Sequence, residues 1–442
     1  YPFLEYFEIC NEPNWYYKTD EEINMYVNVV NETRNILPDK TILVGCTMQY
    51  NSDSWSEEDK YDYDRFLKKI TEYGAYSVSD VYTYHVYSLK PDNNEFSEYV
   101  KSQNEFKNSI GGFQKFYITE TGLPSIERIG EEKQAETFVQ QKNLLNAEGI
   151  KESITYNFRN TGTNIINYEH NYGLLKIDYT PKLSYYAMKN YYENTNGSEY
   201  IGIVNLADGL EAHVYDKDGK PKIIAWSDNT DNTITIPYED FTASDIYGNE
   251  IENTSGTLEI TTSPVYLDNI SNKYFYEAIS NTALEKYAEF EEKFSTELSS
   301  INGIDEKINE LKNYMSAISS NTTETQDSAI KMMSEHFALG NTILNAYKNG
   351  MLDVEYVKVS SMLDMLNDIG DSYEDLLTVS ATAREAYYAE TQKLIDSAEK
   401  IINDNADLDI VYPTKILDFA KELDEKSEYI NSLEEENDIK TG

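Results

Sequence analysis

Two glutamates each follow an apolar, strand-like segment and stand at the start of a loop. Glu12 lies in the motif CNEPN after segment 6–10, and Glu120 lies in ITETG after segment 116–119. In a parallel barrel or sheet the carboxyl ends of all strands meet at one edge, where active sites are built. Two carboxyl groups roughly 5–5.5 Å apart can cleave a glycosidic bond, because one protonates the leaving group while the other attacks the anomeric carbon.

A third strand-end motif supplies further polar side chains. The segment 80–85 runs into HVY, which contains His85 and Tyr87. The two carboxyl groups must have different environments, since an apolar wall and a like charge raise a carboxyl pKa, whereas hydrogen-bond donors keep a carboxyl group ionised. A histidine at such a place can equally be a hydrogen-bonded core residue, and both readings stay open for His85.

Alternating short strands and amphipathic helices must position these groups. We predict strands at 6–10, 41–45, 80–85, 116–119 and 153–157, with a helix after each. Thr19 and Glu22 form a capping box ahead of the first helix. Apolar stripes at helical spacing are typical of faces that pack on a sheet, and they contain Ile23, Tyr26, Val27, Val30, Phe66, Leu67, Ile70, Tyr73, Phe96, Tyr99, Val100, Phe106, Ala135, Phe138, Val139 and Leu145.

The motifs NEPN, HVY and TETG occur in the order found on strands 4, 6 and 7 of clan A retaining glycoside hydrolases. The chain resembles the family 39-like branch of that clan over about residues 4–270, and the segment YGLLKIDYTPKLSYYAMKN resembles the passage from strand 8 to the last barrel helix. The resemblance implies an α/β fold containing strands 4–8 of a (β/α)8 TIM barrel, followed by a small antiparallel β-sandwich.

The resemblance also implies roles for single residues. Glu12 matches the general acid/base and Glu120 the nucleophile, while Asn11 matches the amide that binds the sugar 2-hydroxyl. His85 and Tyr87 match the support on strand 6, which would hold Glu120 ionised and correctly turned. We expect no metal and no organic cofactor, because two carboxyl groups can do the proton transfer and the nucleophilic attack themselves.

Aromatic side chains near these motifs could bind a sugar ring. Trp15 is expected to be either a stacking platform or part of the packing of a lid, and Tyr156 or Phe158 offers a second platform. Glu8 shares strand parity with Glu12, so it should point into the barrel and need a basic partner. The loop residues Glu169, His170 and Asn171 are expected to be polar loop groups and not substrate contacts.

The composition changes twice along the 442 residues. We predict part of a barrel at 1–194, then short alternating strands with Asp-Gly and Gly-Asn turns at 195–271, which are typical of a small β-sandwich. At 272–442 the chain is rich in Glu, Lys, Ser and Ala with helical spacing, which favours an acidic bundle of about five or six helices.

Charge and cysteine content exclude several functions. The net charge of −42 would repel phosphate backbones, so nucleic-acid binding is disfavoured, and a carbohydrate fits better as a partner. No segment has the length and apolarity of a membrane span. The two cysteines, Cys10 and Cys46, are expected to be buried thiols and not a disulfide.

A closed barrel of this type needs three more βα units ahead of residue 6. We therefore expect a longer natural polypeptide, with any secretion signal upstream, and a secreted or cell-surface location, in bacteria if the Tyr-, Asn- and Lys-rich composition is a guide. The alternative to a glycosidase is a non-catalytic carbohydrate-binding or cell-surface structural protein with a degenerate barrel. In either case the helical region could bind the cell envelope or a protein partner.

Overall fold

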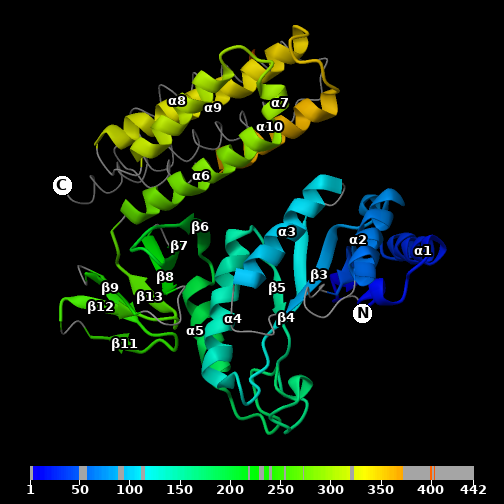
Figure 1. Ribbon diagram of the computed structural model, residues 1–442, viewed down its shortest axis with the longest axis vertical. Coiled ribbons are helices and arrows are strands. Elements are labelled where there is room, and N and C mark those ends of the chain that lie inside the picture. The colour runs from blue at the N-terminus through cyan, green and yellow to red at the C-terminus, as the bar shows by residue number, and fades with distance from the viewer. Residues whose placement is uncertain are drawn as a thin grey trace, which may run out of the picture.

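The computed structural model describes most of the chain up to Asp371. The described residues are 3–48, 57–87, 94–110, 115–217, 220–227, 233–237, 241–252, 255–271, 273–318 and 323–371, together with 399, 400 and 403. Figure 1 shows three parts in chain order: a parallel sheet with its helices, a group of antiparallel strands, and an array of long helices. The predicted helices beyond Asp371 lie outside this range, apart from those three residues.

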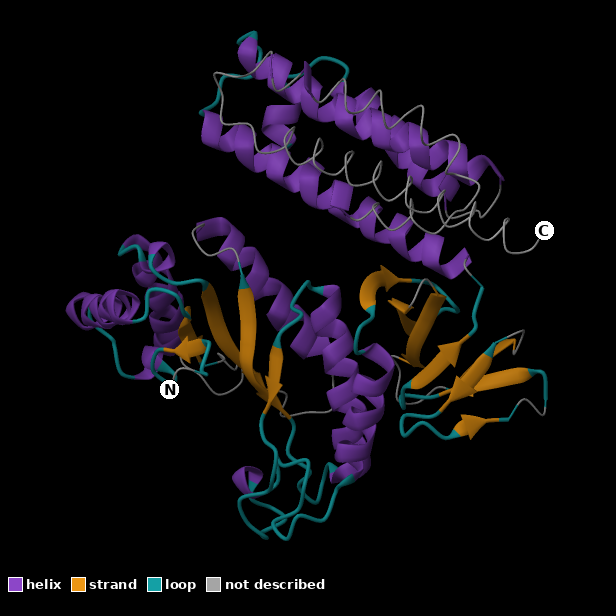
Figure 2. Ribbon diagram, turned by 180° about the vertical axis from the view of Figure 1, so that it is seen from behind, coloured by secondary structure: helices purple, strands orange, loops and turns teal. Residues whose placement is uncertain are grey.

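The first part is a curled parallel sheet of five strands within the described residues, in the order β1-β2-β3-β4-β5. Its strands are β1 (Tyr6–Glu8), β2 (Thr41–Thr47), β3 (Val81–Tyr87), β4 (Phe116–Gly122) and β5 (Ser153–Thr155). All five predicted strands are confirmed, with ends that differ by up to three residues. Because β1 and β5 have a neighbour on one side only, the sheet is open at both edges (Figure 2).

Helices connect these strands and cover one face of the sheet. They are α1 (Asp20–Ile36), α2 (Glu57–Glu72), α3 (Asn94–Ile110), α4 (Gly130–Ala147) and α5 (Leu183–Thr195), with the 3-10 helices η1 (Pro13–Trp15), η2 (Ala75–Ser77) and η3 (Tyr168–His170). The predicted capping box is present at the start of α1, where the Thr19 hydroxyl accepts from the Glu22 amide and the Glu22 carboxylate accepts from the Thr19 amide. We call the region from β1 to α5 the half-barrel.

Strand alternation divides the side chains of β3 between two environments. Tyr82, Tyr84 and Val86 are buried among the predicted helix stripes, which include Ile23, Phe66 and their neighbours. Burial of each such side chain stabilises the fold by roughly 1.5–3 kcal/mol. The intervening residues of β3 therefore face the other side of the sheet, where the strand-end motifs lie.

The second part contains eight antiparallel strands within the described residues. They are β6 (Glu199–Ile203), β7 (Leu210–Lys217), β8 (Lys220–Ser227), β9 (Ile234–Pro237), β10 (Thr242–Ser244), β11 (Glu250–Ile251), β12 (Thr257–Ile260) and β13 (Val265–Asp268). Six form one sheet, in the order β11-β10-β13-β8-β7-β6, and β12 pairs with β9. The predicted antiparallel region is thus present, and we call it the sandwich.

Polar and aromatic side chains join the sandwich to the half-barrel. The Tyr215 hydroxyl of β7 donates to Asn143 of α4 at 2.7 Å and accepts from Asn146 at 2.9 Å. Tyr191 of α5 lies 3.4 Å from the same hydroxyl. These groups lie among buried apolar side chains of both regions, so the contact is packed as well as hydrogen-bonded.

The third part is helical: α6 (Lys273–Lys293), α7 (Ser295–Leu298), α8 (Ile304–Ile318), α9 (Thr323–Lys348) and α10 (Tyr356–Asp371). The first of these continues directly from the sandwich. Asn281 and Thr282 of α6 donate to the carbonyls of Ile203 and Ile201, so the helix covers the edge strand β6. Among the described residues, no helix combines the length and the apolar character that crossing a membrane requires.

Two expectations for the strand ends are wrong. Cys10 is exposed and not buried, because it lies in the turn after the edge strand β1, whereas Cys46 is buried as expected; both thiols are free. Glu8 points to the inner face of the sheet as expected, since its carboxylate accepts a hydrogen bond from the Thr83 hydroxyl at 2.6 Å, but it is exposed. Exposure and this donor satisfy the charge of Glu8, so it needs no basic partner.

Candidate active site

The turn after β1 places Glu12. Cys10 and Glu12 adopt left-handed backbone conformations, with φ values of 68° and 46°, and Glu12 is the cap residue of η1. A residue with a side chain costs roughly 1–2 kcal/mol in this conformation. Tyr26 of α1 holds the turn, since its hydroxyl donates to the Ile9 carbonyl at 3.1 Å. The result is that the Glu12 carboxylate turns toward β3.

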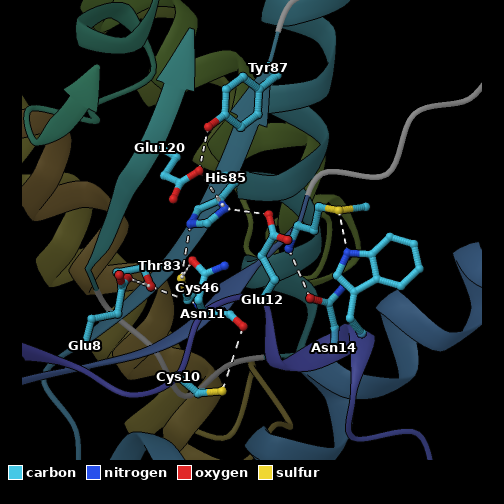
Figure 3. A network of polar contacts seen from close by, with 12 residues as sticks. Glu8, Cys10, Asn11, Glu12, Asn14, Cys46, Thr83, His85, Tyr87 and Glu120 are labelled. Carbon is cyan, nitrogen blue, oxygen red and sulfur yellow. Dashed lines mark hydrogen bonds and ion pairs between the residues drawn. The ribbon is translucent and has the colours of Figure 1, made fainter. Parts of the chain in front are cut away.

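Pairing between β3 and β4 places Glu120. His85 lies opposite Glu120 and Tyr87 opposite Gly122, after a register shift between Tyr84 and His85. The shift changes the alternation at the strand end, which allows residues of both strands to reach the same space. In Figure 3 Tyr87 and His85 point toward Glu120, and Glu12 reaches the same ring nitrogen of His85 from the other side.

The structure brings the two predicted catalytic carboxylates together. One oxygen each of Glu12 and Glu120, and one ring nitrogen of His85, lie within 4.8 Å of one another. Nδ1 of His85 is 2.9 Å from Oε1 of Glu12 and 3.5 Å from Oε2 of Glu120, so the ring stands between them (Figure 3). The Tyr87 hydroxyl donates to Oε2 of Glu120 at 2.5 Å.

Burial differs between these groups. The His85 side chain is 0% exposed, whereas the carboxyl groups of Glu12 and Glu120 are 22% and 28% exposed. Burial, with the adjacent Glu120 carboxylate as a further cause, raises the pKa of Tyr87 far above its ordinary value. Tyr87 therefore keeps its hydroxyl hydrogen and is a permanent donor to Glu120.

Glu12, His85 and Glu120 are also residue types that bind metal ions. Nδ1 of His85 already has the Glu12 carboxylate as a direct partner at 2.9 Å.

Cys46 is a residue of this site whose role the sequence did not reveal. Its Sγ lies 3.1 Å from Nε2 of His85, on the side of the ring away from the carboxylates. Sγ also lies 3.8 Å from Oδ1 of Asn11, which brings the predicted 2-hydroxyl ligand next to the same thiol. A single buried cysteine carries no pattern in a sequence, so only its place behind His85 identifies it.

Trp15 lies beside Glu12 at the rim. Its ring is 43% exposed, Nε1 donates to Sδ of Met48 at 2.6 Å, and Nζ of Lys18 lies 5.7 Å from the ring centroid. The buried Asn14 side chain accepts from the Met48 amide at 3.0 Å and so fixes the segment under the indole. An exposed, held aromatic ring of this kind can stack on a sugar.

A group of tyrosines lies on the other side, beyond Glu120. The rings of Tyr87, Tyr156 and Tyr172 meet edge to face in all three pairs, with centroids 5.4–6.0 Å apart. Tyr156 is half-buried, whereas Phe158 is exposed on the following loop. Tyr172 is a second residue that the sequence did not single out, since it follows no strand and lies far along a loop.

Buried polar side chains hold the loop that carries Tyr172. Nε2 of Gln134 donates to the carbonyls of Leu123, Asn171 and Tyr172 at 2.7–3.3 Å. Nζ of Lys182 donates to the carbonyls of Asn171 and Gly173, and burial lowers the pKa of Lys182 to about 7. As expected from the sequence, Asn171 is a loop group: its amide donates to the carbonyls of Asn164 and Asn167.

The chain is similar to solved glycoside hydrolases. A family 39 glycoside hydrolase from the gut symbiont Bacteroides cellulosilyticus is 22% identical, with a TM-score of 0.47 over 59% of this chain and 57% of that one. A family 30 endoxylanase from Clostridium papyrosolvens is 12% identical, with a TM-score of 0.37 over 60% and 65% of the two chains. A family 30 subfamily 8 xylanase from Clostridium acetobutylicum is 10% identical, with a TM-score of 0.35 over the same shares.

Each of these matches spans less than two thirds of the other protein's length. No protein-family model matches the chain, and neither does any curated protein.

Proposed function

We propose that this protein is a retaining glycoside hydrolase that cleaves O-glycosidic bonds of a polysaccharide or oligosaccharide. Glu120 is the nucleophile and Glu12 the general acid/base. The observation that supports this most directly is the pair of carboxylates within 4.8 Å of each other, with Tyr87 donating to Glu120. The strand-end motifs in the sequence support the same assignment.

In the first step Glu120 forms a bond to the anomeric carbon while the bond to the leaving-group oxygen breaks. Glu12 gives its proton to that oxygen, which leaves a glycosyl ester on Glu120. In the second step Glu12, now ionised, removes a proton from water, and the water oxygen displaces Glu120. The hydrogen bond from Tyr87 suits Glu120 to its role, because it holds the attacking carboxylate in one orientation.

The spacing favours retention over inversion of configuration. An inverting enzyme needs room for a water molecule between sugar and base, so its carboxyl groups lie roughly 6.5–9.5 Å apart. Oxygens of Glu12 and Glu120 are closer than that, at no more than 4.8 Å. Direct attack by Glu120 therefore fits the site better than activation of a water molecule by Glu120.

The surroundings favour a carbohydrate that stacks on aromatic rings near the two carboxylates. Trp15 lies in η1, which Glu12 caps, and Tyr156 packs on Tyr87, the donor to Glu120. The net charge of −42 favours a neutral or cationic glycan. Extracellular polymers are the usual substrates of this chemistry, and we propose a secreted or cell-surface location.

The experiment is turnover of a panel of 4-nitrophenyl glycosides by the chain and by matched variants. We expect Glu120→Ala to lose nearly all turnover and Glu12→Gln to lose roughly 10²- to 10⁴-fold in kcat. Sodium azide should rescue Glu120→Ala and give a glycosyl azide of inverted configuration. Glu5→Gln is the control, because Glu5 is an exposed glutamate that precedes β1, at the opposite end of the strand, and pairs with Lys40.

Full activity of either catalytic variant would contradict the assignment. If the chain binds oligosaccharides but turns over none of the panel, the non-catalytic carbohydrate-binding alternative would replace it.

A further inference from the structure

The buried thiol of Cys46 completes a line of contacts that ends on the carboxylate pair. Sγ lies 3.1 Å from Nε2 of His85, and Nδ1 of the same ring lies 2.9 Å from Glu12 and 3.5 Å from Glu120. Both Cys46 and His85 are 0% exposed. Each ring nitrogen of His85 thus has a protein partner, and the partner of Nε2 is the sulfur.

The backbone of β2 is bent in a way that aims this sulfur. Gly45 and Cys46 both have left-handed conformations, with φ values of 98° and 43°, and the β2–β3 register shifts between Val44 and Thr47. A Cβ on Gly45 would lie 2.2 Å from the Tyr82 ring, so only glycine fits there.

Hydrogen bonds to two other elements, α1 and β3, hold the bend. The Gly45 amide donates to the Tyr26 hydroxyl at 3.0 Å, and the Cys46 amide donates to the Thr83 hydroxyl at 2.9 Å. Since a left-handed cysteine is itself unfavourable, its surroundings must fix this conformation.

The chemistry of the partners decides which nitrogen of His85 carries the proton. Burial raises the pKa of the Cys46 thiol well above its ordinary value, so the sulfur keeps its hydrogen at neutral pH. A neutral imidazole has one donor and one acceptor nitrogen. The thiol has one hydrogen and two possible acceptors, Nε2 of His85 at 3.1 Å and Oδ1 of Asn11 at 3.8 Å, and the shorter contact is to Nε2. With the S–H donating to Nε2, Nδ1 carries the proton and points it at the two carboxylates.

The opposite tautomer makes poorer contacts on both sides. Nε2–H would have only a neutral sulfur, which is a weak acceptor. The lone pair of Nδ1 would face the Glu12 oxygen at 2.9 Å and the Glu120 oxygen at 3.5 Å. In the proposed reaction Glu120 attacks as a carboxylate and Glu12 carries a proton. The Nδ1 lone pair would then repel Glu120 and would accept the Glu12 proton that the leaving group needs, so this tautomer does not suit the reaction.

We propose that Cys46 is a positioning residue of the carboxylate pair, which holds the proton of His85 on Nδ1. Nδ1–H then binds Oε1 of Glu12 and leaves Oε2 as the atom that gives and takes the proton in catalysis. The inference rests on the proposed function of Glu12 as general acid/base. In this proposal the Cys46 thiol, which takes no part in the reaction itself, controls the orientation of the Glu12 carboxyl group through His85.

Nitrogen-15 NMR of the histidine rings tests the tautomer without any need for activity. The chain has four histidines, and the signals of His85 are those that disappear in His85→Gln. We expect the Nδ1–H tautomer in the wild type and in Cys46→Ser, whose hydroxyl can also donate. Cys46→Ala should show a mixture of tautomers or mainly Nε2–H.

Cys46→Gly is a second variant without a donor, since glycine adopts φ 43° freely. Valine would not serve, because a β-branched residue is strained in that conformation. A wild-type His85 with its proton on Nε2, or donor-free variants with an unchanged tautomer, would overturn the proposal.

Kinetics on the most active glycoside of the panel provide the second readout. We expect the donor-free variants to lose about 10-fold in kcat with KM nearly unchanged and with an altered pH profile, and Cys46→Ser to restore most of the rate. Equal rates and equal pH profiles for Cys46→Ala and Cys46→Ser would count against the proposal.

Lack of activity in the wild type would instead remove the proposed function, and the NMR result would still show whether Cys46 sets the tautomer.

Discussion

Two fully buried histidines, one in the half-barrel and one in the sandwich, have very different surroundings. His85 lies between a thiol and two carboxylates at the end of β3. His213 of β7 stacks on Trp226 with ring centroids 4.8 Å apart, and its Nδ1 pairs with the Tyr200 hydroxyl at 3.1 Å. Nε2 of His213 is 3.7 Å from the nearest Glu211 oxygen, beyond hydrogen-bond distance.

Burial alone therefore does not decide which groups a histidine contacts. In the sandwich, burial lowers the pKa of His213 to about 3, so the ring is neutral and serves packing. In the half-barrel, two ionisable groups face the ring and reach solvent on their other side. The strand ends of the half-barrel bring together side chains from several loops, whereas His213 lies within β7 between the rings of Tyr200 and Trp226.

The largest expected effect is the loss of folding stability at acid pH that results from burying His213 in its neutral form. Its folded pKa of about 3 lies below the unfolded value of about 6.5, so the unfolded chain binds more protons between these values. The contribution of neutral His213 to the free energy of unfolding is fully present above pH 6.5. It decreases as the pH falls, by on the order of 3 kcal/mol down to pH 4. The thermal midpoint should fall accordingly, and His213→Phe, which keeps a ring on Trp226, should flatten that fall.

His336 of α9 is the matched comparison for His213. Burial lowers its pKa to about 4, so it contributes to the same loss, and His336→Phe should flatten the curve less than His213→Phe does. A steep, unchanged fall in the His213→Phe variant would show that other groups control acid stability.

The next largest effect is the loss of turnover expected when the hydrogen bond from Tyr87 to Glu120 is removed. Tyr87→Phe removes the hydroxyl 2.5 Å from Oε2 of Glu120 but keeps the ring. A hydrogen bond to a charged group contributes about 1.5–3 kcal/mol, so we expect kcat to fall roughly 10- to 100-fold on the preferred glycoside. Tyr172→Phe, in the same group of rings, is the control and should change kcat by less than about threefold. Similar losses in both variants would mean that the aromatic packing, and not the donor, matters.

The smallest effect concerns the exposed indole at the rim. Trp15→Ala should raise KM for an oligosaccharide about 3- to 10-fold with little change in kcat, since ring contacts contribute about 0.5–1.5 kcal/mol. Tyr76 in η2 is exposed to nearly the same degree, at 45% against 43%, and lies before β3, at the other end of the strand. Tyr76→Ala should leave KM unchanged. If both variants behave alike, Trp15 is part of the rim's packing and not a platform.

Particular residues show how much of the fold and of the site can be predicted from the sequence. The segment DVYTYHVY predicted β3, and the capping box at Thr19 predicted the start of α1, because both patterns depend only on residues close together in the sequence. The strand-end motifs also predicted the end of the sheet at which Glu12, His85 and Glu120 meet. The ends of β1 and β4 lie at the same edge of the sheet because the strands are parallel, so Glu12 and Glu120 meet there.

Long-range geometry explains what the sequence did not reveal. Cys46 reaches His85 only through the bend at Gly45, and Tyr172 reaches Tyr87 only because Gln134 and Lys182 hold its loop. Neither contact follows a spacing along the chain. The exposure of Cys10 and Glu8 was likewise not predictable from strand parity, since it depends on β1 being the edge of the sheet.

The central claim is that Glu120 forms a covalent bond to the sugar while Glu12 transfers the proton. The most direct measurement is peptide mass spectrometry of the chain after reaction with the 2-deoxy-2-fluoro analogue of its preferred glycoside. The account predicts one added fluorosugar per chain, bound to the peptide that contains Glu120, and none in Glu120→Gln. A label on another carboxylate, or turnover with inverted product and no adduct, would contradict it.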